Sequence, residues 1–234
     1  MCIRTIFLSQ SEPQNQMPFE RELFELSQSC GEIILLLYSW NGDVISTGKL
    51  QKRLKINREK CERDGVKVVE RISGGRAVFH SNDICYSLSI PQKYVKKTGK
   101  NLNEAICEIS KPIIKTLAEF KIFTDGNSLQ RRNLHSDFCA ETQSVGEISV
   151  GKKKLVANSQ IYSAQGILQH GTIPVSFAYR RIYDYIEGDA AHGKKYLEEN
   201  TTCLNEISPQ LKAQDFMKSL AKNFADWGTG ITGN

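Results

Sequence analysis

A cysteine and a lysine in the second half of the chain are of the types that carry out acyl transfer. Cys139 ends a polar stretch, Asn133–Phe138, and Lys154 follows it across an expected hairpin. An ammonium group close to a thiol favours the thiolate, which is the nucleophilic form of cysteine. A partly buried lysine can also act as an acid or a base. Each residue also has an ordinary interpretation, since most buried cysteines are inert and a basic hairpin tip is normally exposed.

A pair of glycines between arginines is a second candidate feature. The segment Arg71–His80 contains the turn Ser73–Gly75 and then continues into an apolar run. Glycine lets the backbone approach a ligand closely, and consecutive N–H groups in such a turn can bind an anion. The neighbouring Arg71 and Arg76 add positive charge. The turn could hold a phosphate, a carboxylate or an acyl oxygen, although a plain hairpin turn with surface arginines is the simpler explanation of its local chemistry.

The histidines and cysteines do not have the spacing of metal ligands. His170 precedes a glycine within the apolar run Leu168–Ile173, where a histidine is more often a hydrogen-bonded core residue than a catalyst. The four histidines lack ligand spacing, and the seven cysteines include no CxxC pair. The sequence also lacks a P-loop, a dinucleotide-binding glycine motif and the motifs of zinc proteases and serine hydrolases. We therefore expect no metal site.

The elements that position these residues are mostly short strands, with a few amphipathic helices. Apolar runs or period-2 alternation predict strands at 32–38, 66–69, 77–80, 84–90, 121–124, 147–150, 155–161 and 167–175. Helical spacing predicts helices at 17–30, 102–120 and 208–227, and Pro112 should kink the second of these or mark its start. The polar segment 49–64 has some helical character. This order indicates an α+β fold with a mixed or antiparallel sheet.

The composition is that of a folded protein with free thiols. The chain has 234 residues, 40% of them hydrophobic and 24% charged, which suits a single domain over 1–234. The net charge is +5, but the basic residues are spread over several short runs, so we expect no nucleic-acid binding. A shallow basic surface for an acidic protein partner is the secondary interpretation. The odd cysteine count and the lack of a signal-peptide pattern or a long apolar run predict a cytoplasmic protein that does not cross a membrane.

Several segments, taken in order along the chain, are similar to the motifs of one known family. They are Leu37–Trp40, Ser46–Gln51, Arg71–Gly75, Val78–His80, Tyr86–Ser87, Lys153–Gln160, Leu168–Ile173 and Cys203–Glu206. Their order and spacing resemble the biotin/lipoate protein ligase superfamily, in the branch of lipoate–protein ligase A and the cysteine-dependent octanoyltransferases. The resemblance covers roughly residues 15–228 and is strongest over 33–178.

This resemblance implies a fold, a site and a reaction type. The fold would be a mixed, largely antiparallel sheet flanked by helices, as in the catalytic domain of class II synthetases and biotin–lipoate ligases, without a C-terminal accessory domain. An acyl tunnel would lie near the glycine turn. Cys139 would be the nucleophile, and Lys154 would supply or accept the proton and position the carbonyl group. The implied substrate-binding residues are Arg71, Ser73, Gly74, Gly75, Arg76, His80, Ser159, His170 and Gly171.

Glu70 and Asn158 depart from the family pattern. Glu70 stands where the motif usually has its first arginine, and Asn158 stands where a glycine is usual. A glutamate adds negative charge beside an expected phosphate, which weighs against the use of ATP. Arg76, in place of a third glycine, is a residue that the cysteine-dependent octanoyltransferases also tolerate.

The leading hypothesis is therefore an acyltransferase that needs no cofactor. It would move an octanoyl or lipoyl group from a thioester on acyl carrier protein through an acyl-Cys139 to a lysine of a lipoyl-type carrier domain, such as the glycine-cleavage H protein or an E2 subunit. A variant of this reaction moves the group between two carrier domains. The alternatives are an ATP- and Mg-dependent lipoate–protein ligase, and a non-catalytic homologue that binds an acyl group or a partner.

Overall fold

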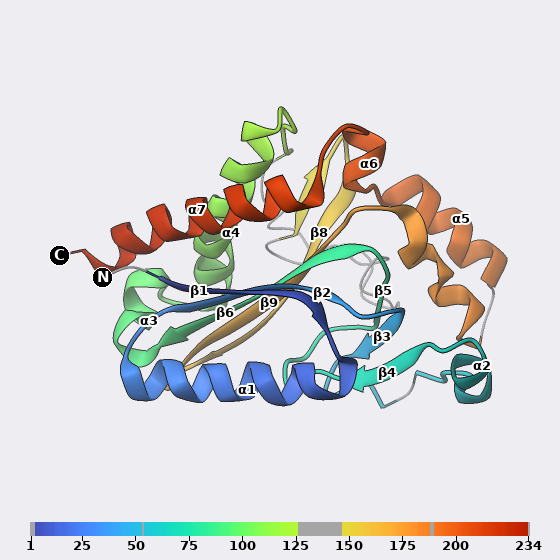
Figure 1. Ribbon diagram of the computed structural model, residues 1–234, viewed down its shortest axis with the longest axis horizontal. Coiled ribbons are helices and arrows are strands. Elements are labelled where there is room, and N and C mark those ends of the chain that lie inside the picture. Colours follow the sequence, from blue (N-terminus) through green and yellow to red (C-terminus); the bar gives the residue numbers. More distant parts are fainter. Residues whose placement is uncertain (1–2, 53, 126–146, 188–189, 234) are drawn as a thin grey trace.

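A six-stranded sheet forms the centre of the molecule (Figure 1). The computed structural model describes residues 3–52, 54–125, 147–187 and 190–233. The strand order is β1 (Arg4–Ser11), β2 (Ile34–Trp40), β6 (Asp83–Pro91), β9 (Gly166–Pro174), β8 (Lys153–Ser163) and β7 (Ile148–Val150). β1 and β2 are parallel, and every other neighbouring pair is antiparallel. The predicted α+β fold with a mixed, largely antiparallel sheet is confirmed.

A smaller sheet packs beside the large one. It has the order β4 (Lys67–Glu70), β3 (Val44–Thr47) and β5 (Val78–His80), with β3 parallel to β4 and antiparallel to β5. The remaining elements are α1 (Pro13–Cys30), α2 (Arg58–Arg63), α3 (Gln92–Thr98), α4 (Leu102–Glu119), the 3-10 helix η2 (Phe177–Asp184), α5 (Ala190–Asn200), α6 (Leu204–Ile207) and α7 (Ala213–Thr232). In Figure 1, α1 covers one face of the large sheet, and α4 and α7 cover the other.

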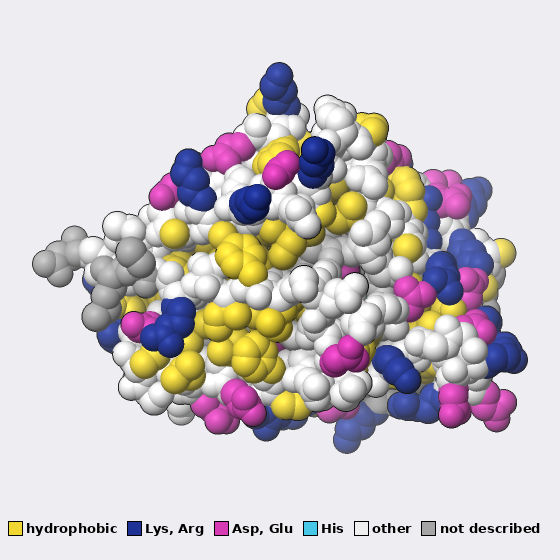
Figure 2. All heavy atoms as spheres, viewed as in Figure 1, with side chains coloured by type: hydrophobic (Ala, Val, Ile, Leu, Met, Phe, Trp, Pro, Cys, Tyr) yellow, Lys and Arg dark blue, Asp and Glu magenta, His cyan; other side chains and the backbone are white. Residues whose placement is uncertain are grey.

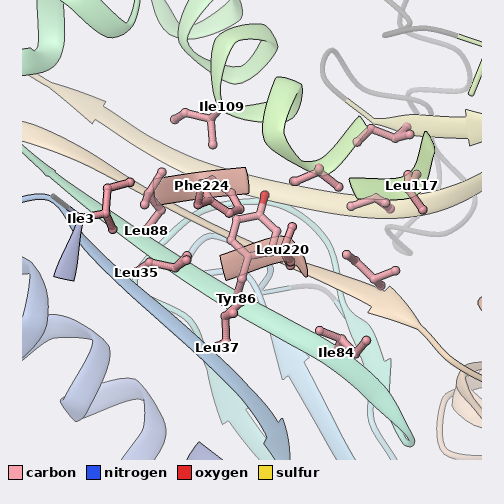
Figure 3. Packing of buried hydrophobic residues seen from close by; sticks show 14 of the residues in the cluster. Ile3, Leu35, Leu37, Ile84, Tyr86, Leu88, Ile109, Leu117, Leu220 and Phe224 are labelled. Atoms are coloured by element: carbon pink, nitrogen blue, oxygen red, sulfur yellow. The ribbon is translucent and has the colours of Figure 1, made fainter. Parts of the chain in front are cut away.

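The two faces of the large sheet explain the unbroken apolar run of β2. Leu35 and Leu37 belong to the core on the α4 and α7 side, whereas Leu36 belongs to the core on the α1 side. A strand that is buried on both faces has no polar alternation, because each side of it meets an apolar layer. Figure 3 shows Leu35 and Leu37 with Ile109 and Phe224 in the first of these cores.

Several element boundaries differ from the sequence prediction. The strand predicted at 121–124 is absent. Lys121 has a φ of 61° and ends the turn that follows α4, and Ile122 is buried in the core without being part of a strand. Among the described residues of the segment 49–64, only α2 is helical. The last helix begins at Ala213 rather than near Ser208, and α4 continues through Pro112. The sequence patterns do not predict β1, β3, α3, α5, α6 and η2.

β1 is an edge of the large sheet and is only partly covered. Figure 2 shows hydrophobic side chains on both sides of this strand, and Phe7 is 52% exposed. Among the described residues, no helix has both the length and the apolar character needed to cross a bilayer.

Candidate active site

A cavity lies on the α1 side of the large sheet, where the small sheet packs against β8 and β9. Residues far apart in the chain meet here because both sheets contribute to the walls. Of the predicted substrate-binding residues, those that line this cavity are Arg71, Gly75, Arg76, His80, Ser159, His170 and Gly171. Ser73 is fully buried and is hydrogen-bonded to two of these lining residues. We call this space the first cavity.

Arg71 holds the glycine turn in place. Its Nη1 donates hydrogen bonds to the carbonyl oxygen of Ser46 (2.8 Å) and to Ser46 Oγ (2.6 Å), and its Nη2 donates to the carbonyl oxygen of Arg76 (2.8 Å). Gly75 has a φ of 89°, which strongly favours glycine, and a Cβ atom there would lie 3.3 Å from Ser159 Oγ. The guanidinium group therefore connects the turn to β3. It does not lie at the surface, which is where a plain hairpin turn with surface arginines would place it.

A buried hydrogen-bonded chain links Glu20 of α1 to this turn. His170 Nδ1 lies 2.8 Å from Glu20 Oε2, and His170 Nε2 bonds to Ser73 Oγ. Ser73 Oγ lies 2.9 Å from Ser159 Oγ, which donates to the carbonyl oxygen of Gly74 at 2.9 Å. Ser73 and Ser159 thus connect the His170 ring to the backbone of the glycine turn.

Glu20 is ionised in this environment. Burial alone would raise its pKa, but the charge of His170 and hydrogen bonds from His170, Gln16 and Tyr38 lower its pKa below the ordinary value. Glu20 is not among the residues that the sequence predicted for the site. The only hint of it in the sequence is its position on the otherwise buried face of the predicted first helix, where a carboxylate is unusual unless it has a partner.

A second network of the same kind lines the opposite wall. Ser46 Oγ accepts from Arg71, and it lies 2.7 Å from His80 Nε2. His80 Nδ1 then donates to Asp83 Oδ2, at 2.6 Å, and Thr172 Oγ1 also donates to this oxygen. Burial raises the pKa of Asp83, but the charge and hydrogen bond of His80 outweigh this and lower it. The predicted His80 is thus a structural part of the wall.

His80, Asp83 and Cys85 form the group within the described ranges that lies closest to a metal-binding arrangement. Cys85 Sγ is 3.4 Å from Asp83 Oδ2 and 3.7 Å from His80 Nδ1. Burial and the negative charge of Asp83 raise the pKa of the Cys85 thiol well above its ordinary value, so the thiol stays protonated. A protonated thiol is a poor metal ligand, and the hydrogen bond to Asp83 already uses His80 Nδ1. These residues fit a hydrogen-bonded wall better than a metal site.

Lys154 lies at an adjoining cavity. This second cavity is lined by Lys154, by Asp83 and by mostly apolar side chains, among them Leu155, and shares Val78, Ala157 and Thr172 with the first cavity. Lys154 is only 5% exposed, and its Nζ donates to Glu147 Oε1 at 2.5 Å. The neighbouring lysines differ from it: Lys152 is exposed, and Lys153 is half-buried.

Cys139 lies outside the described residues, as do Asn133–Phe138 and His135. Its role as the nucleophile and its distance from Lys154 therefore stay predictions.

Of the two departures from the family motifs, Glu70 lies away from the first cavity, whereas Asn158 is among its lining residues but directs its side-chain oxygen to Tyr86. Glu70 is exposed at the end of β4 and does not line the cavity. Asn158 Oδ1 accepts from the hydroxyl of Tyr86 (2.7 Å), whose ring packs against Phe224 of α7. The Asn158 side chain thus lies on the face of the sheet that α4 and α7 cover. Gly171 makes room for this contact, since a Cβ atom there would lie 2.4 Å from Asn158 Oδ1.

Comparison with known proteins places this geometry in context. The sequence profile described as "Lipoyl protein ligase A/B catalytic domain" matches residues 12–225. The protein named Octanoyltransferase LipM from Oceanobacillus iheyensis is 27% identical over 204 residues, which covers 84% of this chain and 74% of that protein. The protein of the same name from Clostridioides difficile is 28% identical, and the match covers 82% of this chain and 74% of that protein. The protein of the same name from Exiguobacterium sibiricum is 30% identical over 158 residues, which covers 64% of this chain and 57% of that protein.

Solved structures share the fold at low sequence identity. A lipoate-protein ligase A bound with ATP superposes with a TM-score of 0.76 at 13% identity, covering 97% of this chain and 85% of that one. A bipartite lipoate protein ligase from Thermoplasma acidophilum, studied with its E2 lipoyl domain, gives 0.75 at 12% identity, with 97% and 84% covered. Both comparisons agree with the resemblance seen in the sequence motifs.

Proposed function

We propose, from the premise that the chain belongs to the lipoyl protein ligase A/B catalytic-domain family, that it is an octanoyltransferase. The acyl group passes from a carrier-protein thioester through Cys139 to a lysine of a lipoyl-type carrier domain. The observation that carries this proposal is the pair of adjoining cavities, one with a partly apolar wall and the other lined by the buried Lys154. This arrangement provides a site for an acyl chain next to a cation for its carbonyl group.

The first cavity holds the acyl chain in this proposal. Its apolar wall comes from Met17, Tyr38, Trp40, Val78 and Cys85. Transfer of the chain from water to this wall contributes about 0.8 kcal/mol for each methylene group. The buried Ser–His–carboxylate networks hold the polar part of the wall rigid, because each of their side chains is tied to a second element.

The chemistry runs in two steps with a covalent intermediate. The Cys139 thiolate attacks the carbonyl carbon of the donor thioester, and the carrier thiolate leaves and takes a proton from water. The amine of the acceptor lysine then attacks acyl-Cys139, which forms the amide and releases the Cys139 sulfur. Lys154 and backbone N–H groups near Ser159 or the Ser73–Gly75 turn stabilise the negative charge on the carbonyl oxygen in both steps.

A thioester donor makes a nucleotide unnecessary, because thioester cleavage itself drives formation of the amide. The structure of the glycine turn also favours this reaction over ATP-dependent ligation. Of the two arginines at the turn, Arg71 directs its Nη1 and Nη2 donors to Ser46 and to the carbonyl oxygen of Arg76. A guanidinium group engaged in this way is poorly placed to bind a phosphate. The ATP-dependent ligase is therefore not our preferred reaction.

The proposed partners are an acyl carrier protein as donor and a lipoyl domain as acceptor. The net charge of +5 supports an acidic partner, since charge complementarity increases the rate of encounter. On the face in Figure 2, basic side chains are mixed with acidic ones and are most numerous toward the end that carries α2 and α5.

Mass spectrometry tests the proposed function directly. The purified protein is incubated with octanoyl-acyl carrier protein in the absence of ATP, and then with a lipoyl domain. We expect an octanoyl adduct on Cys139 that disappears as the domain is modified. Cys139→Ser should form no thioester and should not modify the domain. Full activity of Cys139→Ser, or modification of the domain only with ATP and free acid, would overturn the proposal.

A further inference from the structure

Lys154 and Glu147 form an ion pair in the interior of the protein. Lys154 Nζ and Glu147 Oε1 are 2.5 Å apart, and the two residues are 5% and 1% exposed. Removing two charges from water is costly, so a buried pair of this kind is weak evidence for a role in stability alone. The pair adjoins the second cavity, whose lining includes Lys154 but not Glu147. The Glu147 carboxylate thus contacts the Lys154 ammonium group from outside the lining of the cavity.

A β-bulge places the two side chains together. Ile148 pairs with Val156, but the next residue, Ser149, pairs with Lys154, so that β8 has one extra residue. In a regular strand Leu155 and Val156 would face opposite sides, yet both belong to the same core. A bulge re-aims the neighbouring side chain, and here that side chain is Lys154.

The backbone of Lys154 is also held. Its carbonyl oxygen accepts a hydrogen bond from the N–H of Thr202 at 3.0 Å, and Lys154 forms an isolated bridge with Thr201. Thr201 and Thr202 line the second cavity as well. Both ends of the lysine are therefore fixed, the backbone by the segment before α6 and the ammonium group by Glu147.

We infer that Glu147 is the positioning residue of this site, which fixes Lys154 as a cation at the wall of the second cavity. This inference rests on the proposed function, because the role of Lys154 is part of that proposal. An opposite charge at this distance favours the ammonium form over the amine. Lys154 then acts as a hydrogen-bond donor and a positive charge toward the carbonyl oxygen, and not as a general base.

The proton balance agrees with a cationic Lys154. Cys139 attacks as a thiolate, so the first step needs no base. In the second step the acceptor amine loses its proton to the departing Cys139 sulfur as the C–N bond forms and the C–S bond breaks. The Cys139 thiol then gives this proton to water, which restores the thiolate and balances the proton that the carrier thiolate took from water. Lys154 keeps its protons throughout.

A double-mutant cycle on acyl transfer tests this inference. The variants are Glu147→Gln, Lys154→Met and the double variant, each assayed for kcat and KM with octanoyl-acyl carrier protein. We expect Glu147→Gln to lower kcat by about tenfold to a hundredfold and to change KM less than about twofold. In the Lys154→Met protein the same substitution should cause no further loss, because Glu147 acts through the lysine. If the loss of kcat in the double variant equals the product of the losses in the two single variants, the inference is wrong.

The exposed Lys115–Asp226 pair provides the control. It joins α4 to α7 at 3.2 Å, with side chains 56% and 54% accessible, and neither residue lines either cavity. Asp226→Asn removes one paired carboxylate away from the site and should leave kcat unchanged. If Glu147→Gln does not fold, Glu147→Asp takes its place in the cycle, since it keeps the charge but shortens the side chain. It must lower kcat in the wild-type background and have no effect beside Lys154→Met.

Amine labelling separates this inference from the proposed function. Competitive acetylation followed by peptide mass spectrometry reports the reactivity of Lys154 without any substrate. We expect Lys154 to become more reactive in Glu147→Gln and to be unchanged in Asp226→Asn. Failure of the wild-type protein to acylate Cys139 would refute the proposed function alone, whereas equal labelling of Lys154 with and without Glu147 would refute the positioning role.

Discussion

His170 Nδ1 lies 2.8 Å from Oε2 of Glu20, a residue 150 positions away in the chain. This contact joins α1 to β9 through the interior and orients the His170 ring toward Ser73 of the glycine turn. Glu20 also accepts hydrogen bonds from Gln16 (2.9 Å) and Tyr38 (3.0 Å). The carboxylate is thus the point at which a helix, two strands and the turn are held together.

Replacement of Glu20 by glutamine should destabilise the protein. The substitution keeps the shape of the side chain but removes the charge and offers an N–H₂ group where acceptors are needed. We expect a loss of about 1–3 kcal/mol, the cost of leaving buried hydrogen-bonding groups unsatisfied. Urea unfolding followed by circular dichroism measures it. Glu22→Gln, on an exposed part of the same helix, should change the midpoint little.

Stability should decrease at acid pH because Glu20 and Asp83 have lowered pKa values in the folded state. The unfolded chain therefore binds more protons than the folded one, and protonation favours unfolding. The stabilisation is fully present above the ordinary values of 4.5 and 3.8 and is lost as the pH falls through the lower pKa values of the folded state. Unfolding free energies measured from pH 7 downward should show this decline, and Asp83→Asn should make it shallower. A pH-independent free energy across this window would contradict the assignment.

Gly171→Ala should destabilise the sheet. The added Cβ atom would lie 2.4 Å from Asn158 Oδ1 and 2.6 Å from Tyr86 Cε1, so the Tyr86–Asn158 hydrogen bond must be displaced. Overpacking of this kind costs about 1–3 kcal/mol. Thermal unfolding measures the loss. Gly74→Ala is the control, because a Cβ atom there meets nothing within 4 Å and should leave the melting temperature almost unchanged.

Asn158→Gly should restore the residue usual in the family without a gain in acyl binding. Asn158 lines the first cavity, but its side chain contacts Tyr86 on the face of the sheet that α4 and α7 cover, so we expect its removal not to enlarge the acyl site. We expect kcat/KM for octanoyl transfer to change less than about threefold, together with a stability loss of about 1 kcal/mol from the lost hydrogen bond. A large increase in kcat/KM would show instead that Asn158 obstructs the acyl chain.

The local sequence determined the family, the type of fold and many of the wall residues. The motifs around Ser73–Gly75 and Leu168–Ile173 are continuous segments, and their residue order is visible without coordinates. Strands such as β2 and β6 could be predicted because burial leaves a pattern with a period of one or two residues. β1 escaped prediction because it is a partly exposed edge strand with an irregular burial pattern.

Only the tertiary structure decided which polar residues act together. Glu20, Asp83 and Glu147 belong to no recognised motif, whereas Ser46 opens the motif Ser46–Gln51. Folding brings Glu20 to His170, Ser46 to Arg71 and His80, and Glu147 to Lys154. A sequence pattern records the period of a strand but not a bulge in it, and the bulge in β8 is what brings Lys154 next to Glu147. The chain thus specified the chemical groups locally, while their charge states and orientations arose from long-range contacts in a buried environment where a charged side chain is stable only beside its partner.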